Sequence, residues 1–236
     1  MLALSRRRWL AAALGCTMGR LAGAAPTAVE QRAVGDFDSV LWNAAGELHI
    51  EQAAREGLSI EAEPAVLAKI VTAVRQRRLS IAFAPGRVES RWPIRFRLAM
   101  RSLAALETRG SGSVHVGPLS TDELSLHLAG SESVLLARLH ARRLEARLDG
   151  ACDLAIEGGQ VDRQRIVIGG AANYRAAQLG SREADIAIDG SGDVQVAVSD
   201  RLVARIAGSG EVVYTGTPRV AQSVTGAGAV RRAEKA

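Results

Sequence analysis

Apolar residues recur at fixed distances from a set of evenly spaced glycines in the second half of the chain. The sequence numbers of successive glycines in this set differ by 20 four times and then by 18 twice. The positions two and four before each glycine, and four and six after it, are almost all apolar and rich in β-branched residues. The positions between them are mostly polar. The seven glycines are Gly110, Gly130, Gly150, Gly170, Gly190, Gly208 and Gly226.

Period-2 alternation on both sides of a glycine turn predicts two short β-strands per repeat, with apolar side chains inward and polar side chains outward. Self-similarity at this period indicates a solenoid, because stacked equivalent columns bury a core that no single coil could bury. The chain is therefore predicted to be all-β, a single-stranded parallel β-helix or β-solenoid with seven coils of about 18–20 residues. The last two intervals are two residues shorter, and we expect the missing residues to be lost from a loop on one face of the solenoid.

The preceding part of the chain alternates in the same way but lacks the glycine register. Strands are predicted at residues 40–42, 46–51, 58–62, 79–83 and 94–98. One short helix is predicted at 65–74, where apolar residues follow a helical period and Arg75, Arg77 and Arg78 favour its C-terminal end through the helix dipole.

These patterns divide the chain into sections. We expect residues 25–105 to form an N-terminal section that caps the solenoid and continues its sheets, and residues 106–230 to form the regular repeat. The last coil leaves an open strand edge, which Thr217-Pro218 and the charged tail 231–236 would blunt.

Residues 1–24 have the features of an export signal peptide. Arg6-Arg7-Arg8 precedes a short apolar run, and Ala22-Gly23-Ala24 fits a small-x-small cleavage site, which predicts a periplasmic or cell-surface protein. Two sub-types remain open. Residues 5–10 resemble a twin-arginine signal, whereas residues 13–16 resemble a lipobox that would make Cys16 a lipidated N-terminus.

The positive charge does not indicate nucleic-acid binding. The formal charge of +5 falls to +1 without the four arginines of residues 1–24, and only 3% of residues are aromatic. The remaining basic residues alternate with acidic ones instead of forming a stripe, so no nucleic-acid partner is expected. No apolar stretch approaches the roughly 20 residues of a membrane span. Cleavage near Ala24 would leave Cys152 as a single, partly buried thiol without an internal disulfide.

Motifs of known chemistry are missing from the sequence. His49, His115, His127 and His140 lack metal-ligand spacing, and His115 and His127 are expected to face solvent. No nucleophile elbow, phosphate loop or dinucleotide fingerprint occurs. We therefore assign no catalytic, cofactor-binding or metal-binding residue and no cofactor.

Surface aspartates give the strongest alternative, a polysaccharide-active enzyme of the β-helix type. Asp149 and Asp189 share one column of the repeat, and Asp153 and Asp193 share another. Members of each pair are two coils apart, about 9–10 Å by the strand spacing. That distance is too long for a retaining pair of carboxylates and at the limit for an inverting pair.

Several segments together resemble a bacterial family, the putative auto-transporter adhesin, head GIN domain. These segments are Phe37, Val40, Gly46–Glu51, Leu79–Ile81, Leu103–Leu106, the run of G-S-G turns and the ending Gly208–Pro218. Gly150-Ala151-Cys152 and Gly170-Ala171-Ala172 depart from the usual G-S-G. The resemblance covers roughly residues 35–230 and implies an exported β-solenoid of the cell envelope. It supplies no catalytic residues.

The leading hypothesis is a non-enzymatic binding or adhesion module of the cell envelope. A long regular solenoid surface suits an extended partner, either a polysaccharide or another envelope protein. The alternatives are the enzyme with Asp149, Asp153, Asp189 and Asp193, and a structural protein whose open coil edge pairs with another chain.

Overall fold

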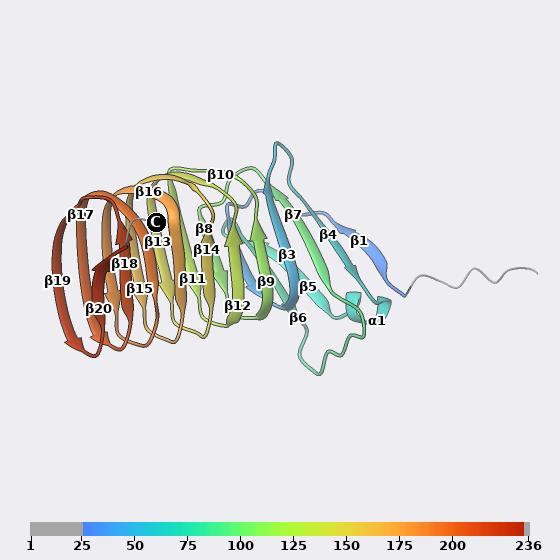
Figure 1. Cartoon of the computed structure of the whole chain (residues 1–236). Helices are drawn as coiled ribbons and strands as arrows, with labels where there is room; N and C mark the ends of the chain where they lie inside the picture. The colour runs from blue at the N-terminus through green and yellow to red at the C-terminus, as the bar shows by residue number, and fades with distance from the viewer. Residues whose placement is uncertain (1–25, 234–236) are drawn as a thin grey trace, which may run out of the picture.

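A computed structural model describes residues 26–233, and nearly all of its elements are β-strands (Figure 1). The chain forms a β-solenoid of about six turns, as the repeat predicted. The seven glycine turns of the repeat delimit six complete turns between them. Within the described range, no helix is long and apolar enough to cross a membrane.

The strands fall into an N-terminal group and a repeat group. The N-terminal group consists of β1 (Ala28–Arg32), β2 (Ser39–Asn43), β3 (Ala45–Gln52), β4 (Gly57–Ala62), helix α1 (Pro64–Leu67), β5 (Ile70–Arg75), β6 (Arg78–Phe83) and β7 (Arg95–Met100). The repeat group consists of β8 (Ala105–Thr108), β9 (Ser111–Val116), β10 (Leu119–Ser120), β11 (Glu123–Leu128), β12 (Ser131–Leu136), β13 (Leu139–Leu148), β14 (Asp153–Ile156), β15 (Gly159–Ile168), β16 (Asn173–Ile188), β17 (Val194–Gly208), β18 (Glu211–Thr215), β19 (Arg219–Gly226) and β20 (Ala229–Arg232).

The repeat group builds two walls of parallel strands. The first wall contains β8, β11, β13, β15, the second halves of β16 and β17, and β19. The second wall contains β9, β12, β14, the first halves of β16 and β17, β18 and β20. A short third row of parallel pairings begins at β10, where Leu119 pairs with Leu139, and continues through Gly159 to Leu179.

Equivalent residues of successive coils pair in register, which places like side chains in continuous columns. Leu126 pairs with Ala146, Ala146 with Ile166, and Ile166 with Ile186. All four are at most 1% exposed. Burying one Leu or Ile side chain stabilises a fold by about 1.5–3 kcal/mol, so the columns supply the main stabilising term.

The shortening of the repeat lies on one face, between the two walls, but it falls within strands β16 and β17 instead of in the predicted loop. Ala176 pairs with Val196, whose sequence number is higher by 20, whereas Glu183 pairs with Arg201, whose number is higher by only 18. The register shifts lie between these two pairs. The columns of the two walls keep their alignment because the change lies between the walls.

The N-terminal strands continue both walls, but not in chain order. On the first wall, β2 lies between β6 and β8, and on the second wall β3 lies between β7 and β9. Strands β5, β4 and β1 then add in antiparallel orientation to β6, β7 and β4. The layer formed by β2 and β3 is therefore covered on both sides by segments that follow it in the sequence.

The helix predicted at 65–74 is wrong beyond Leu67. Helix α1 makes a single turn, and Ile70–Arg75 is strand β5, antiparallel to β6. Gln76 and Arg77 have φ of 49° and 60° and form the tight turn between the two strands. The segment is rich in β-branched residues, which favour strands, and its arginines belong to this hairpin rather than to a helix end.

One chain of buried polar groups crosses the core. The Tyr174 hydroxyl donates to Gln164 Oε1 at 2.8 Å, Gln164 Nε2 donates to Ser181 Oγ at 2.7 Å, and Ser181 Oγ donates to the Ala197 carbonyl at 2.8 Å. Burial raises the pKa of Tyr174 far above its ordinary value. Each side chain of this network is satisfied, which a polar group needs when it replaces an aliphatic residue in a core column.

A buried acid lies at one of the glycine turns. Glu132 is 3% exposed and pairs with Gly112 in register. Thr108 Oγ1 donates a hydrogen bond to Glu132 Oε1, while Glu132 Oε2 has no partner among the described residues. Burial raises the pKa of Glu132, and the hydrogen bonds from Thr108 and at Gly130 offset this only in part. Burial and the nearby Glu132 also raise the pKa of Cys152 to about 11, so its thiol is protonated and unreactive at neutral pH.

Substitution of Gly150 tests whether the backbones of neighbouring coils approach too closely for a side chain. A Cβ at Gly150 would lie 2.0 Å from the Gly130 carbonyl oxygen. Gly150→Ala should therefore lower the free energy of unfolding in urea by about 1–3 kcal/mol. Gly57→Ala is the matched control, since nothing lies within 4 Å of its added Cβ. Equal losses in the two variants would contradict the steric explanation.

Glu132 predicts a pH-dependent stability. Its folded-state pKa is raised, so its favourable contribution is fully present below the unfolded-state pKa and is lost as pH rises through the folded-state pKa. Glu132→Gln should therefore unfold at higher urea concentration than the wild type at neutral pH and differ little near about pH 4. Glu145→Gln, at an exposed position of β13, is the control. A destabilised Glu132→Gln at neutral pH would refute this assignment.

Candidate functional site

The first wall carries charged side chains in rows that run across the coils. One outward row contains Glu123, Arg143, Arg163, Glu183 and Arg201, which follow one another through the parallel register. A second row, two positions further along each strand, contains Glu145, Arg165, Asp185 and Val203. The rows exist because outward positions of a parallel stack repeat at the strand spacing, about 4.8 Å.

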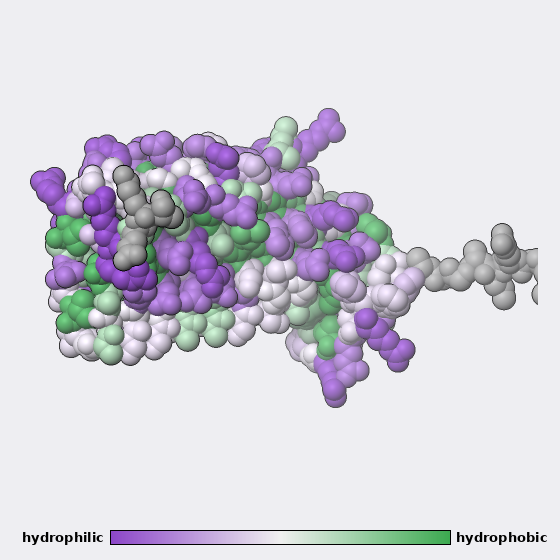
Figure 2. All heavy atoms as spheres, in the orientation of Figure 1, coloured by the Kyte–Doolittle hydropathy of each residue, from purple (hydrophilic) through white to green (hydrophobic). Residues whose placement is uncertain are grey.

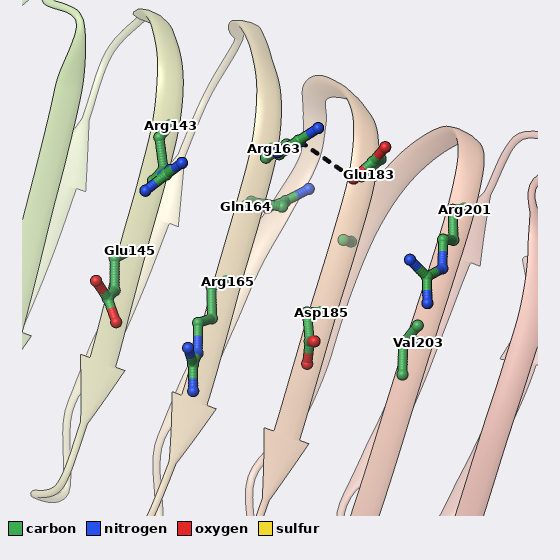
Figure 3. A pocket seen from close by; sticks show the side chains of 10 residues that line it. Arg143, Glu145, Arg163, Gln164, Arg165, Glu183, Asp185, Arg201 and Val203 are labelled. Carbon is green, nitrogen blue, oxygen red and sulfur yellow. Dashed lines mark ion pairs between the residues drawn. The ribbon is translucent and has the colours of Figure 1, made fainter.

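A hollow of about 290 Å³ lies among these rows, on β13, β15, β16 and β17 (Figure 3). Its lining includes four arginines and three acidic residues. They are Arg143, Arg163, Arg165, Arg201, Glu145, Glu183 and Asp185. A second hollow of about 230 Å³ adjoins it and shares Arg143, Arg163 and Glu183. Together the two hollows extend the polar surface along the wall.

Some of these charges neutralise one another across neighbouring coils. Arg163 Nε lies 3.2 Å from Glu183 Oε2, the dashed pair of Figure 3. Asp185 accepts a hydrogen bond from Arg205 on the next coil. Exposed pairs of this kind contribute about 0–1 kcal/mol each, so their larger effect is to align adjacent strands.

Three charged side chains of the hollow form no ion pair of this kind within the described chain. Within residues 26–233, Arg165, Arg201 and Glu145 form no salt bridge within 4.0 Å and no side-chain hydrogen bond. Guanidinium groups present several donors in a fixed plane, and the carboxylate presents acceptors. The hollow can therefore offer both donors and acceptors to a polar ligand without breaking an existing pair.

Three of the four aspartates of the enzyme hypothesis, Asp149, Asp153 and Asp193, accept local hydrogen bonds. Asp153 and Asp193 lie on either side of Asn173 in one column, as predicted, two coils apart. Asp153 accepts from Asn173 Nδ2 at 2.8 Å, and Asp193 accepts from the Glu211 backbone N–H at 3.2 Å. These hydrogen bonds give Asp153 and Asp193 a structural role in the turns between coils.

Asp149 is held as a carboxylate. It accepts from Arg147 Nε at 2.7 Å and contacts His127 Nε2 at 2.9 Å. Burial would raise the pKa of Asp149, but the hydrogen bonds from Arg147 and His127 outweigh it and lower the pKa below its ordinary value. Gly169 lies between Asp149 and Asp189 in the stack, since the N–H of Gly169 donates to Leu148 and that of Asp189 to Ile168.

The histidines are partly exposed, and the structure pairs two of them. His127 is expected to face solvent, and its side chain is 38% exposed. His49 and His115 stack across strands β3 and β9, with ring centroids 5.0 Å apart and planes 14° apart. Sequence reasoning missed this contact because the order of the N-terminal strands was not foreseen. In the part of the chain that the structure describes, no group of three or more His, Cys, Asp or Glu side chains could hold a metal ion.

Solved structures share this fold across almost their whole length. A putative adhesin from Bacteroides fragilis has a TM-score of 0.83 at 21% identity, with 88% of this chain and 97% of that chain covered. A putative adhesin from Parabacteroides merdae has a TM-score of 0.72 at 18% identity, with 90% and 98% covered. A protein from Parabacteroides distasonis described as a putative lipid binding protein has a TM-score of 0.73 at 20% identity, with 90% and 98% covered.

Sequence comparison assigns the family. No protein with a curated description matches the chain. The family described as putative auto-transporter adhesin, head GIN domain, matches residues 36–218, most of the chain, and this confirms the resemblance carried by the glycine turns and the segment Gly208–Pro218. The chain therefore belongs to the family of the putative auto-transporter adhesin, head GIN domain.

Proposed function

We propose that this protein is an exported, non-enzymatic binding module of the cell envelope, and that the hollowed first wall binds its ligand. The observation that carries the proposal is the hollow itself, where Arg165, Arg201 and Glu145 have no partner in the described chain. The adhesin descriptions of the family and of its structural neighbours support a binding role.

The geometry favours an extended, hydroxyl-rich polymer, a polysaccharide, over a small molecule. The two adjoining hollows are open and lie across several coils, so a long ligand can meet equivalent groups at each strand. Their charges are nearly balanced, which suits hydroxyl groups that both donate and accept hydrogen bonds. An envelope protein is the other partner class that such a surface could accept.

The same contacts argue against catalysis by the aspartates. A general acid needs a pKa near the working pH, whereas the pKa of Asp149 is lowered by Arg147 and His127. Asp153 and Asp193 are occupied by neighbouring groups of the turns. A polysaccharide-active enzyme remains the second candidate, and product analysis tests it directly.

The export signal and its cleavage site lie outside the described residues and belong to this proposal. Its support is the arginine-rich, apolar segment 1–24 and a family description that names an auto-transporter. The division of the remaining chain near residue 105 into a capping section and a regular repeat is proposed with it.

Removal of the two unengaged arginines should weaken polysaccharide binding. The protein would be screened by thermal shift against purified neutral and uronate-containing polysaccharides, and each well would be analysed for cleavage products. For the polysaccharide that binds, Arg165→Gln with Arg201→Gln should raise Kd by about ten-fold for each lost charge-assisted hydrogen bond. Arg175→Gln, on the second wall beside Asp153, is the control and should bind normally.

The outcomes separate the candidates. Binding without products, lost in the double variant and kept in the control, supports the proposal. Products that disappear when Asp149, Asp153, Asp189 and Asp193 are replaced by Asn would establish the enzyme instead. No shift with any polysaccharide would refute the proposed ligand class.

Export predicts a defined N-terminus. Full-length chain made in a bacterial host should be recovered outside the cytoplasm, with Ala25 as its first residue by mass spectrometry. A lipid-modified Cys16 would correct the signal type, and uncleaved protein confined to the cytoplasm would refute export.

A further inference from the structure

At the C-terminal end of the stack, each outermost strand pairs with only one neighbouring strand among the described residues. Strand β19 pairs only with β17, and β20 only with β18, among the described residues. Strand β19 is the outermost strand at the left-hand end of Figure 1. All eight residues of β19 are exposed, so its outer edge presents backbone N–H and C=O groups that no other described strand bonds.

Apolar side chains that belong to the core are uncovered at this edge. Val220, Gln222 and Val224 continue the inward columns of Leu202, Ala204 and Ile206. Val220 is 38% exposed and Val224 39% exposed, because no further coil covers them. Figure 2 shows hydrophobic surface at this left-hand end of the molecule.

Two other edge strands, β1 and β20, carry charges that oppose edge pairing, whereas β19 carries one charged residue at its end. Strand β1, at the opposite end of the stack, contains Glu30 and Arg32, and β20 places Arg232 in an inward column beyond Tyr214. Charged and inward-pointing charged residues protect natural sheet edges from pairing. In β19 the only charged residue is Arg219, at its first position.

The sequence of β19 is complementary to itself in antiparallel orientation. With Gln222 opposite Gln222 of a second copy, Val220 faces Val224 of that copy, and the inward positions of both strands lie on the same side. Arg219 then faces Thr225, so no like charges oppose each other. A shift by one residue would place inward side chains against outward ones, which makes this register the favoured one.

We propose that the outer edge of β19 binds a second copy of this chain, through antiparallel pairing about a two-fold axis at Gln222. Backbone hydrogen bonds supply the affinity, and the two Val220–Val224 contacts continue the core columns across the junction. Such a C2 contact is isologous, so it closes as a dimer and leaves no β19 edge free for a third copy. The hollow on the first wall is a separate site, and this proposal does not depend on its ligand.

Sedimentation tests the proposal on the exported protein without a C-terminal tag, so that the C-terminal end stays free. The wild type should show a monomer–dimer equilibrium between micromolar and millimolar concentrations. Gln222→Lys and Gln222→Glu each place like charges across the axis and should weaken association at least about ten-fold. An equimolar mixture of the two variants should restore the dimer, because opposite charges then face each other.

The controls distinguish this edge from the other end of the stack. Val29→Lys, on β1 with 60% exposure, should leave association unchanged. Circular dichroism and urea midpoints would confirm that all variants fold. A wild type that stays monomeric throughout, a mixture that does not restore association, or a dimer that Val29→Lys dissociates would each overturn the proposal.

Discussion

Every coil of this protein depends on its neighbours for a core, because a single coil has too few apolar side chains to exclude water from itself. The stabilising contact is therefore between equivalent residues of successive coils, such as Ala146 between Leu126 and Ile166. This constraint fixes the register of the strands, keeps small residues at the turns where backbones approach, and places the change of repeat length between the walls. It also makes the interior polar groups exceptional, so Gln164, Ser181 and Tyr174 occur together as one satisfied network.

The same constraint decides what could be foreseen from the sequence. The apolar columns and the strands on either side of each glycine follow from local period-2 alternation and glycine spacing, and the structure confirms them, whereas the third row that begins at β10 was not predicted. The apolar residues of segment 65–74 fit a helical period, and only pairing with β6 decides in favour of a strand. Neither the position of β2 between β6 and β8 nor the His49–His115 stack could be derived, since both depend on contacts between distant segments.

The candidate site could be predicted from the sequence only in part. Alternation places the charged residues of the first wall on the outside, and the register then aligns them into rows. The hollow itself depends on which neighbouring charges pair and which do not, as with Arg163 on Glu183 beside the unengaged Arg165. Which charges pair depends on side-chain conformations, and no sequence pattern specifies these. Because the core columns do not involve these outward positions, chains with only about 20% identity can share the fold.

The order of the N-terminal strands has a consequence for how such a protein can change in length. In the repeat, each coil touches only the coils directly before and after it in the sequence, so whole coils can be added or removed at the C-terminal end without disturbing the rest. At the other end, β2 and β3 are enclosed by β6 and β7 on one side and β8 and β9 on the other. Removal of that first layer would separate strands that otherwise form one continuous stack. Growth and loss of coils are therefore confined to one end of the molecule, while the interleaved end stays constant.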